Sequence, residues 1–133
     1  MTKKTISVVI YGQTFSKSNS RIFTHISGKP RLIKKKEVQD FVNTSLLQLK
    51  SQLRNHTTFE GKVIFEANIY YRSNRSDLDE SLLMDIIEQK KDKKTGIILL
   101  NGIYKNDRQI VEKHIYKHID KNNPRAEITV TEI

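Results

Sequence analysis

The chain contains no cysteine and no tryptophan, and only two prolines and five glycines among its 133 residues. Without cysteine, disulfide scaffolds, thiolate zinc sites and cysteine nucleophiles are excluded. No apolar run approaches the roughly 20 residues that span a bilayer. Residues 1–5 are polar and basic, unlike the apolar region of a signal peptide. These absences predict a cytoplasmic protein with no membrane partner.

Charge is abundant, and its distribution is uneven. The net charge is +9, and 36% of the residues are hydrophobic, enough for one domain over residues 1–133. Residues 1–62 carry 12 basic and 3 acidic side chains, whereas residues 63–133 carry 12 of each. A surplus of this size predicts a polyanionic partner. The split favours a basic binding face in the first half and a site that needs acids in the second.

Hydrophobic periodicity predicts an α/β (α+β) fold with alternating strands and helices. Residues 5–11, 63–71 and 126–131 alternate as strands do, and apolar side chains recur at helical spacing over 36–54 and 78–87. We expect a long cationic loop over 13–36, a solvated loop or a frayed helix end over 89–95, and a turn at Asn101-Gly102. Residues 109–119 fit a strand and a helix equally well.

The densest acidic cluster follows the strand at 63–71. Asp77 and Asp79 are two residues apart, so in an extended segment both carboxylates point to the same side. Mg²⁺ binds through one or two such carboxylates and keeps open positions for water and phosphate. The alternative interpretation is helix capping, because Ser76, Asp77 and Asp79 also suit the first turn of a helix. A third acid, Asp107, is either a further ligand or a residue of the turn before the next strand.

Four blocks of the sequence stand out together. The first is residues 6–12 with Ser-Asn-Ser-Arg at 18–21, and the second is the helix at 36–54. The third is Arg75-Ser76-Asp77-Leu78-Asp79, and the fourth is residues 106–111, which include Asp107. In this order the blocks resemble the RusA family of Holliday junction resolvases, which are small homodimeric, Mg²⁺-dependent endonucleases common in prophages. Residues 124–133 also resemble the last strand of the family, so the resemblance spans nearly the whole chain.

This resemblance implies a mixed β-sheet flanked by two main helices, with 109–118 as a strand. It implies that Asp77 and Asp79, which match the D-x-D pair of the family, and Asp107, which matches its later acid, are the catalytic and metal-binding residues. It implies Mg²⁺, with Mn²⁺ as an alternative, and no other small-molecule cofactor. It further implies a homodimer that resolves four-way branched DNA by paired phosphodiester hydrolysis in recombination and repair.

Three positions depart from the family pattern. Glu80 replaces the usual Asn, Leu83 replaces the usual Lys, and Asn106 replaces an acid that often precedes the last aspartate. Residues 79–107 also form a longer segment than usual, and a gap within it aligns Lys94 as the catalytic lysine. The missing lysine leaves open a second interpretation, a catalytically weakened or inactive protein of the same fold that binds branched DNA.

Basic residues near these blocks are predicted to contact DNA phosphates, which makes binding salt-dependent. They are Lys17, Arg21, Lys34, Lys35, Lys36, Arg72 and Arg75. An RNA-binding accessory protein is a third alternative, which the 8% of aromatic residues and the lack of a stacking motif disfavour. His114 and His118 have the spacing of a zinc site on a helix. The resemblance, however, makes that segment a strand.

Overall fold

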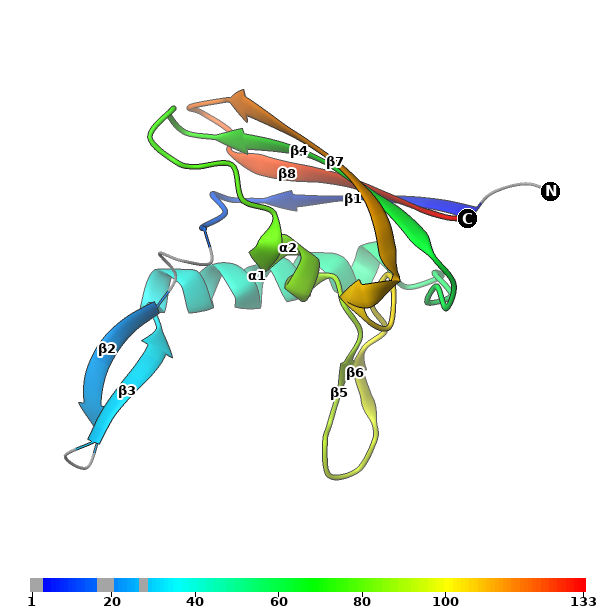
Figure 1. Ribbon diagram of the computed structural model, residues 1–133, viewed down its shortest axis with the longest axis horizontal. Coiled ribbons are helices and arrows are strands. Elements are labelled where there is room, and N and C mark those ends of the chain that lie inside the picture. Colours follow the sequence, from blue (N-terminus) through cyan, green and yellow to red (C-terminus); the bar gives the residue numbers. More distant parts are fainter. Residues whose placement is uncertain (1–3, 17–20, 27–28) are drawn as a thin grey trace.

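A four-stranded mixed β-sheet forms the centre of the computed structural model (Figure 1). Across the sheet the strands are β1 (Lys4–Tyr11), β8 (Arg125–Glu132), β4 (Val63–Tyr71) and β7 (Ile110–Ile119). β8 is antiparallel to both β1 and β4, and β4 is parallel to β7. The structure describes residues 4–16, 21–26 and 29–133, and the side chains of 4–16 and 35–133.

Helices cover one face of this sheet. α1 (Lys36–Gln52) and α2 (Ser81–Ile86) lie on the same side (Figure 1). Alternate residues of the strands point toward them, because successive side chains of a strand face opposite sides. The core therefore contains every second residue of β4, joined by apolar residues of the other elements: Val63, Phe65, Ala67, Ile69, Val8, Ile10, Ile128, Val130, Phe41, Leu49, Leu82, Leu83 and Ile86. No helix among the described residues is long and apolar enough to cross a membrane.

Two glutamines of α1 satisfy the outer edge of strand β1. Gln52 accepts from the backbone nitrogen of Val9 and donates to its carbonyl, both at 2.8 Å. Gln48 does the same for Tyr11, at 2.7 and 3.1 Å. The two amides replace the hydrogen bonds of a neighbouring strand. They protect an edge that would otherwise be free to pair with another chain.

Two β-hairpins extend from the helical side of the molecule, away from the sheet (Figure 1). One joins β2 (Arg21–Ile26) to β3 (Lys29–Lys34), and the other joins β5 (Lys90–Lys91) to β6 (Ile98–Leu100). The predicted loop over 13–36 is therefore wrong for most of its length, and the loop predicted over 89–95 begins with a strand. A projecting hairpin need not bury a continuous face, so its sequence lacks the alternation that identifies core strands.

The other predicted strands and helices agree with the structure, apart from one shortened helix. The strands at 5–11, 63–71 and 126–131 and the helix at 36–54 are confirmed, and residues 110–119 are a strand. The helix predicted over 78–87 begins only at Ser81, because Asp79 Oδ1 accepts from the Ser81 nitrogen at 2.8 Å and the chain before it is not helical. The N-cap position itself is Glu80, whose side chain makes no capping hydrogen bond, so Asp79 accepts a first-turn nitrogen from the residue before the cap.

The base of the β5–β6 hairpin is closed by residues 101–104. Gly102 has φ of +73°, and a Cβ there would collide with the backbone of Glu88 and Gln89. The Gln89 nitrogen donates to the Tyr104 carbonyl at 2.9 Å, and the Ile103 nitrogen donates to Ile87 at 2.8 Å. No hydrogen-bonded turn is found at Asn101-Gly102, so the turn predicted there is wrong; the chain bends at Ile103 instead, and only glycine fits position 102.

Candidate active site

The acidic segment that follows β4 runs back along the sheet, and two lysines of β7 hold it there. Lys117 Nζ donates to the carbonyls of Ser76 at 2.5 Å and Asn74 at 3.3 Å. Lys113 Nζ forms an ion pair with Glu80 at 3.0 Å. In the sheet register, Lys117 pairs with Ile69 and Lys113 with Phe65, so the segment descends from the end of β4 toward its middle.

The return of this segment along the sheet shortens the distance between the D-x-D pair and Asp107. Asp77 and Asp79 follow the last residue of β4, whereas Asp107 precedes the first residue of the parallel neighbour β7. Nine residues of strand at about 3.3 Å each would leave the two ends roughly 30 Å apart. By residue 80 the chain has reached the level of Lys113, three residues beyond the start of β7. The fold thereby moves the D-x-D segment toward Asp107.

Tyr71, the last residue of β4, interacts with the acidic residues that follow the strand. Its buried ring carries a hydroxyl that accepts a hydrogen bond from the Asp79 nitrogen at 3.2 Å. Burial raises the pKa of Tyr71, and the carboxylates of Asp79, Glu80 and Asp77 raise it further, while the hydrogen bond from Asp79 lowers it. All three carboxylates therefore contribute negative charge in the neighbourhood of Tyr71. A negative potential of this kind attracts cations.

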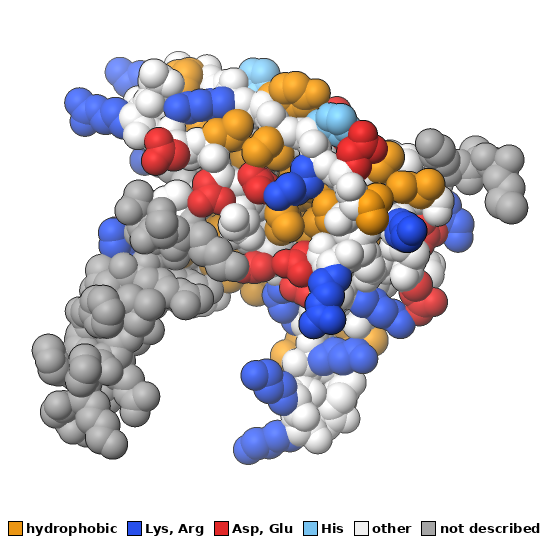
Figure 2. Space-filling view, in the orientation of Figure 1, with side chains coloured by type: hydrophobic (Ala, Val, Ile, Leu, Met, Phe, Trp, Pro, Cys, Tyr) orange, Lys and Arg blue, Asp and Glu red, His pale blue; other side chains and the backbone are white. Residues whose placement is uncertain are grey.

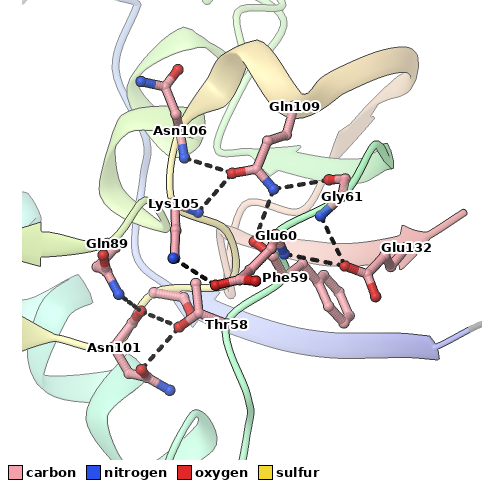
Figure 3. Close-up of polar contacts among 11 residues, drawn as sticks. Thr58, Phe59, Glu60, Gly61, Gln89, Asn101, Lys105, Asn106, Gln109 and Glu132 are labelled. Atoms are coloured by element: carbon pink, nitrogen blue, oxygen red, sulfur yellow. Dashed lines mark hydrogen bonds and ion pairs between the residues drawn. The ribbon is translucent and has the colours of Figure 1, made fainter.

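Gln109 fixes the backbone that carries Asp107 (Figure 3). Asp107 begins a short 3₁₀ turn, η1 (Asp107–Gln109), and the side chain of Asn106 caps it by accepting from Arg108 at 2.9 Å. Gln109 Oε1 accepts from the nitrogens of Lys105 and Asn106, both at 2.9 Å. Its Nε2 donates to the carbonyls of residues 59 and 61 at 2.8 and 2.9 Å. Gln109 and Asn106 therefore hold the turn in place, and the Asp107 side chain takes no part in these hydrogen bonds.

A second acidic group surrounds Tyr104. Burial raises the pKa of Tyr104, and the charges of Glu88, Asp107 and Asp85 add to that rise. Burial also raises the pKa of Glu88, with a further rise from the charge of Asp107, while Lys90 and a hydrogen bond from the Asp107 backbone lower it. Asp107 is thus next to Glu88, a carboxylate that sequence reasoning did not single out.

The charges of Asp77, Asp79 and Glu80 act on the pKa of Tyr71, whereas the charge of Asp107 acts on those of Tyr104 and Glu88, so the acids fall into two groups. α2 connects the two groups, and Figure 2 shows acidic side chains gathered over α2 and the segments beside it. Within residues 4–16 and 35–133, no three His, Asp or Glu side chains are close enough together to form a metal-binding group. The joint binding of one cation by Asp77, Asp79 and Asp107 therefore stays a prediction.

The basic residues predicted to bind DNA lie along one end of this region. Arg72 and Arg75 are exposed in the turn after β4, and Arg75, Ser76 and Asp77 line a hollow of about 240 Å³. Lys35 and Lys36 are at the start of α1, Arg21 is in β2, and Lys34 ends β3. Lys17 lies outside the described residues. Gln13 ties the end of β1 to this turn by accepting from the Arg72 nitrogen at 2.9 Å and donating to Ser76 at 3.2 Å.

The departures from the family pattern have visible structural roles. Leu83 is fully buried in the core on α2. Glu80 is the ion-pair partner of Lys113, and Asn106 caps η1. Lys94 lies exposed in the turn of the β5–β6 hairpin, and its catalytic role stays a prediction.

Sequence reasoning missed four charged residues that contact or surround the predicted acids. They are Asp85, Glu88, Lys113 and Lys117. Lys113 and Lys117 share a face of β7 with Ile115, which packs against the core. That pattern becomes visible only when residues 110–119 are known to be a strand, because a helix would give the same residues different neighbours.

Together, the mixed sheet and the acidic side chains flanked by lysines and arginines define a small α+β protein that presents carboxylates and basic groups on one face. A family model, Endodeoxyribonuclease RusA, matches residues 12–131, and the chain belongs to this family. The match confirms the resemblance found in the sequence and supports nuclease activity in general. Among curated proteins, no match is found.

Proposed function

We propose that this protein is a Mg²⁺-dependent endonuclease that resolves Holliday junctions in the cytoplasm, in DNA recombination and repair. The observation that carries the proposal is the path of residues 76–80. Lys117 and Lys113 of β7 hold this segment so that its acids run from the end of β4 toward Asp107. Membership in an endodeoxyribonuclease family supports the reaction class.

Asp77, Asp79 and Asp107 are the proposed metal ligands. Their donor set fits a hard divalent cation, because all three offer carboxylate oxygens, and the charges of two of them act on the pKa of Tyr71. When bound, Mg²⁺ or Mn²⁺ supplies a Lewis acid and a water of lowered pKa. Two side chains position the backbone that carries these proposed ligands. Tyr71 accepts a hydrogen bond from the Asp79 nitrogen, and Gln109 holds the turn that begins with Asp107.

Basic side chains in the first half of the chain and after β4 are proposed to hold the DNA backbone. Arg75 lines the same hollow as Asp77, so a phosphate bound by Arg75 would lie beside the acids. Lys34, Lys35 and Lys36 precede or begin α1, where positive charge opposes the helix dipole and a second purpose accounts for their presence. A homodimer would present two such sites to a fourfold branched substrate, as paired cleavage requires.

A second candidate function is binding of branched DNA without efficient cleavage. The observation that favours it is Leu83, which occupies the position of the usual lysine and is fully buried in the core. No ammonium group can act from that position. Lys113 supplies positive charge near Glu80 instead, from strand β7 and not from α2.

Cleavage of a fluorescent synthetic four-way junction, in Mg²⁺ and in EDTA, tests the proposed function. The wild type is expected to cut only with the metal. Asp77→Asn should reduce cleavage by about 100-fold or more, a larger loss than the roughly 10–100-fold typical of residues that only orient ligands. Junction binding in EDTA should persist, because the substitution removes negative charge from a DNA-binding surface.

Glu112→Gln is the matched control, since Glu112 is an exposed carboxylate of β7 whose partner is His114. It should cut at the wild-type rate. Cleavage by Asp77→Asn at the wild-type rate would refute the assigned site. A wild type that binds the junction but does not cut it in Mg²⁺ or Mn²⁺ would establish the second candidate function.

A further inference from the structure

The β5–β6 hairpin exposes apolar side chains at a position where a protein surface is usually polar. Ile97 and Leu99 are 62% and 61% exposed, and Ile98 between them is 50% exposed. The hairpin projects beyond α1 on the side opposite the sheet (Figure 1). Three consecutive exposed apolar residues on a projecting element indicate a contact surface.

Lysines flank these apolar residues. Residues 90–99 contain Lys90, Lys91, Lys93 and Lys94 and a single acid, Asp92, which gives a net charge of +3. Figure 2 shows lysine side chains along the outside of this hairpin, below the acidic surface over α2. The lysines are complementary to an anionic partner, and the apolar side chains between them are complementary to apolar groups of the same partner. Nucleic acid bases and phosphates provide both.

The turn of the hairpin is built by its own hydrogen bonds. Asp92 Oδ1 accepts from the nitrogens of Lys94 at 2.8 Å and Thr95 at 3.1 Å, and these bonds lower the pKa of Asp92. The Gly96 nitrogen donates to the Asp92 carbonyl at 2.8 Å, and Gly96 has φ of +73°. The one acid of the hairpin therefore serves its turn, and hydrogen bonds within the hairpin define the backbone that presents Lys93 and Lys94.

A groove of about 370 Å³ separates the hairpin from α1. Leu99 and Leu100 line it on one side, and Leu46, Leu47 and Lys50 line it on the other. Its walls are mainly apolar, and Lys50 and Lys90 stand at its rim. A nucleic acid base could pack against the apolar walls of this groove while its phosphate contacts the lysines.

We propose that the β5–β6 hairpin contacts DNA at a branch point, with Ile97 and Leu99 against unstacked bases and Lys93 and Lys94 on the flanking phosphates. Apolar side chains of DNA-bending proteins pack between base steps in this way. The proposal rests on branched DNA being the substrate, and it assigns the discrimination between branched and linear DNA to the hairpin. Two copies of the chain joined through this surface would bring eight lysines together, which disfavours a second copy as the occupant.

Two double variants separate the two kinds of contact, measured by fluorescence anisotropy in EDTA so that no cleavage is required. Ile97→Ser/Leu99→Ser should weaken binding to a four-way junction by about 10-fold, with little effect on linear duplex. Lys93→Ala/Lys94→Ala should weaken binding to both DNAs and reduce the salt slope by about 1.8, the value for two phosphate contacts. A 2-aminopurine base at the branch point should brighten with the wild type and not with the serine variant.

Ile133→Ser and Lys4→Ala/Lys121→Ala are the controls, because these residues are exposed elsewhere on the molecule. Both should bind and report like the wild type. Equal junction affinity for the serine variant and the wild type would overturn the proposal. So would a change in molar mass by light scattering with DNA binding unchanged, which would make the surface an interface between copies. Because these readouts are independent of hydrolysis, a failure of the Asp77→Asn test leaves them interpretable.

Discussion

Gln109 uses the full hydrogen-bonding capacity of its amide. Its oxygen accepts two backbone N–H groups, and its nitrogen donates to two carbonyls that lie about 50 residues earlier in the chain. This single side chain therefore connects the start of β7 with the entry to β4. The glutamine two residues after Asp107 therefore has a structural role of its own.

Gln109→Ala should lower the free energy of unfolding by about 2 kcal/mol, because four hydrogen bonds of modest net value are lost together. Urea denaturation measures the change. Gln109→Glu keeps both acceptors and removes both donors, so it should also destabilise the protein and disturb the position of Asp107. Wild-type stability in both variants would show that the contacts of Figure 3 contribute nothing.

Asp120 and Arg125 make stability depend on pH. The Asp120 carboxylate accepts from Arg125 at 2.9 Å, and this hydrogen bond is the main reason that the pKa of Asp120 is lowered. A lowered pKa in the folded state means that the stabilisation is present above the unfolded pKa, near 3.9, and is lost as the pH falls through the folded value.

Asp120→Asn should therefore be less stable than the wild type at pH 7, and the difference should shrink below about pH 4. Urea unfolding of both proteins at pH 7, 5 and 3 measures this convergence. If the difference in unfolding free energy stayed constant over this range, the Asp120–Arg125 pair would not contribute to the pH dependence of stability.

At the scale of elements, α1 has a second task besides burying its apolar stripe. Gln48 and Gln52 occupy the free edge of β1 with the hydrogen bonds described above. Gln48→Ala/Gln52→Ala should lower the unfolding free energy by about 2 kcal/mol and promote self-association through β1. Thermal denaturation and light scattering measure the two effects. Gln39→Ala is the control, since the partner of Gln39 is Asn43 within the same helix.

Strand β7 also has two tasks, because its lysines hold the acidic segment. Lys117→Met keeps the apolar stem but loses the donors to the carbonyls of Ser76 and Asn74. If the proposed site is correct, cleavage should fall by about 10-fold, as for residues that orient ligands. The melting temperature should change little, and the Mg²⁺ concentration for half-maximal activity should rise. Lys121→Met, in the exposed turn after β7, is the control.

Elements differed in how far the sequence could predict them. β4 was predicted to the residue because it alternates strictly and is buried at every second position. β7 was ambiguous because polar side chains, including Lys113 and Lys117, face the helical side along with Ile115. The β2–β3 hairpin was missed because it pairs only with itself. The acids of the candidate site were visible as motifs, but the lysines that hold them are 33 to 43 residues away in sequence.

At the scale of the whole molecule, metal binding should be coupled to folding. A cation that binds the folded state alone stabilises it by about 2.7 kcal/mol at 100 times its dissociation constant. Mg²⁺ should therefore raise the melting temperature of the wild type in calorimetry. Asp77→Asn and Asp107→Asn should each abolish the shift, whereas Glu112→Gln should keep it. Equal shifts in all four proteins would indicate unspecific screening of the negative surface.

The close packing of Gly102 against the backbone of Glu88 and Gln89 fixes the base of the β5–β6 hairpin, whereas the tip of the hairpin tolerates changes in length. Residues 92–97 belong to a turn closed on itself, so a longer or shorter tip could be grafted there without displacing Glu88 or Asp107. Any side chain at position 102, by contrast, would push against the strand that leads from Glu88 into the hairpin. The length of the hairpin tip can thus be engineered, or can diverge in evolution, without a change in the backbone around Glu88 and Asp107.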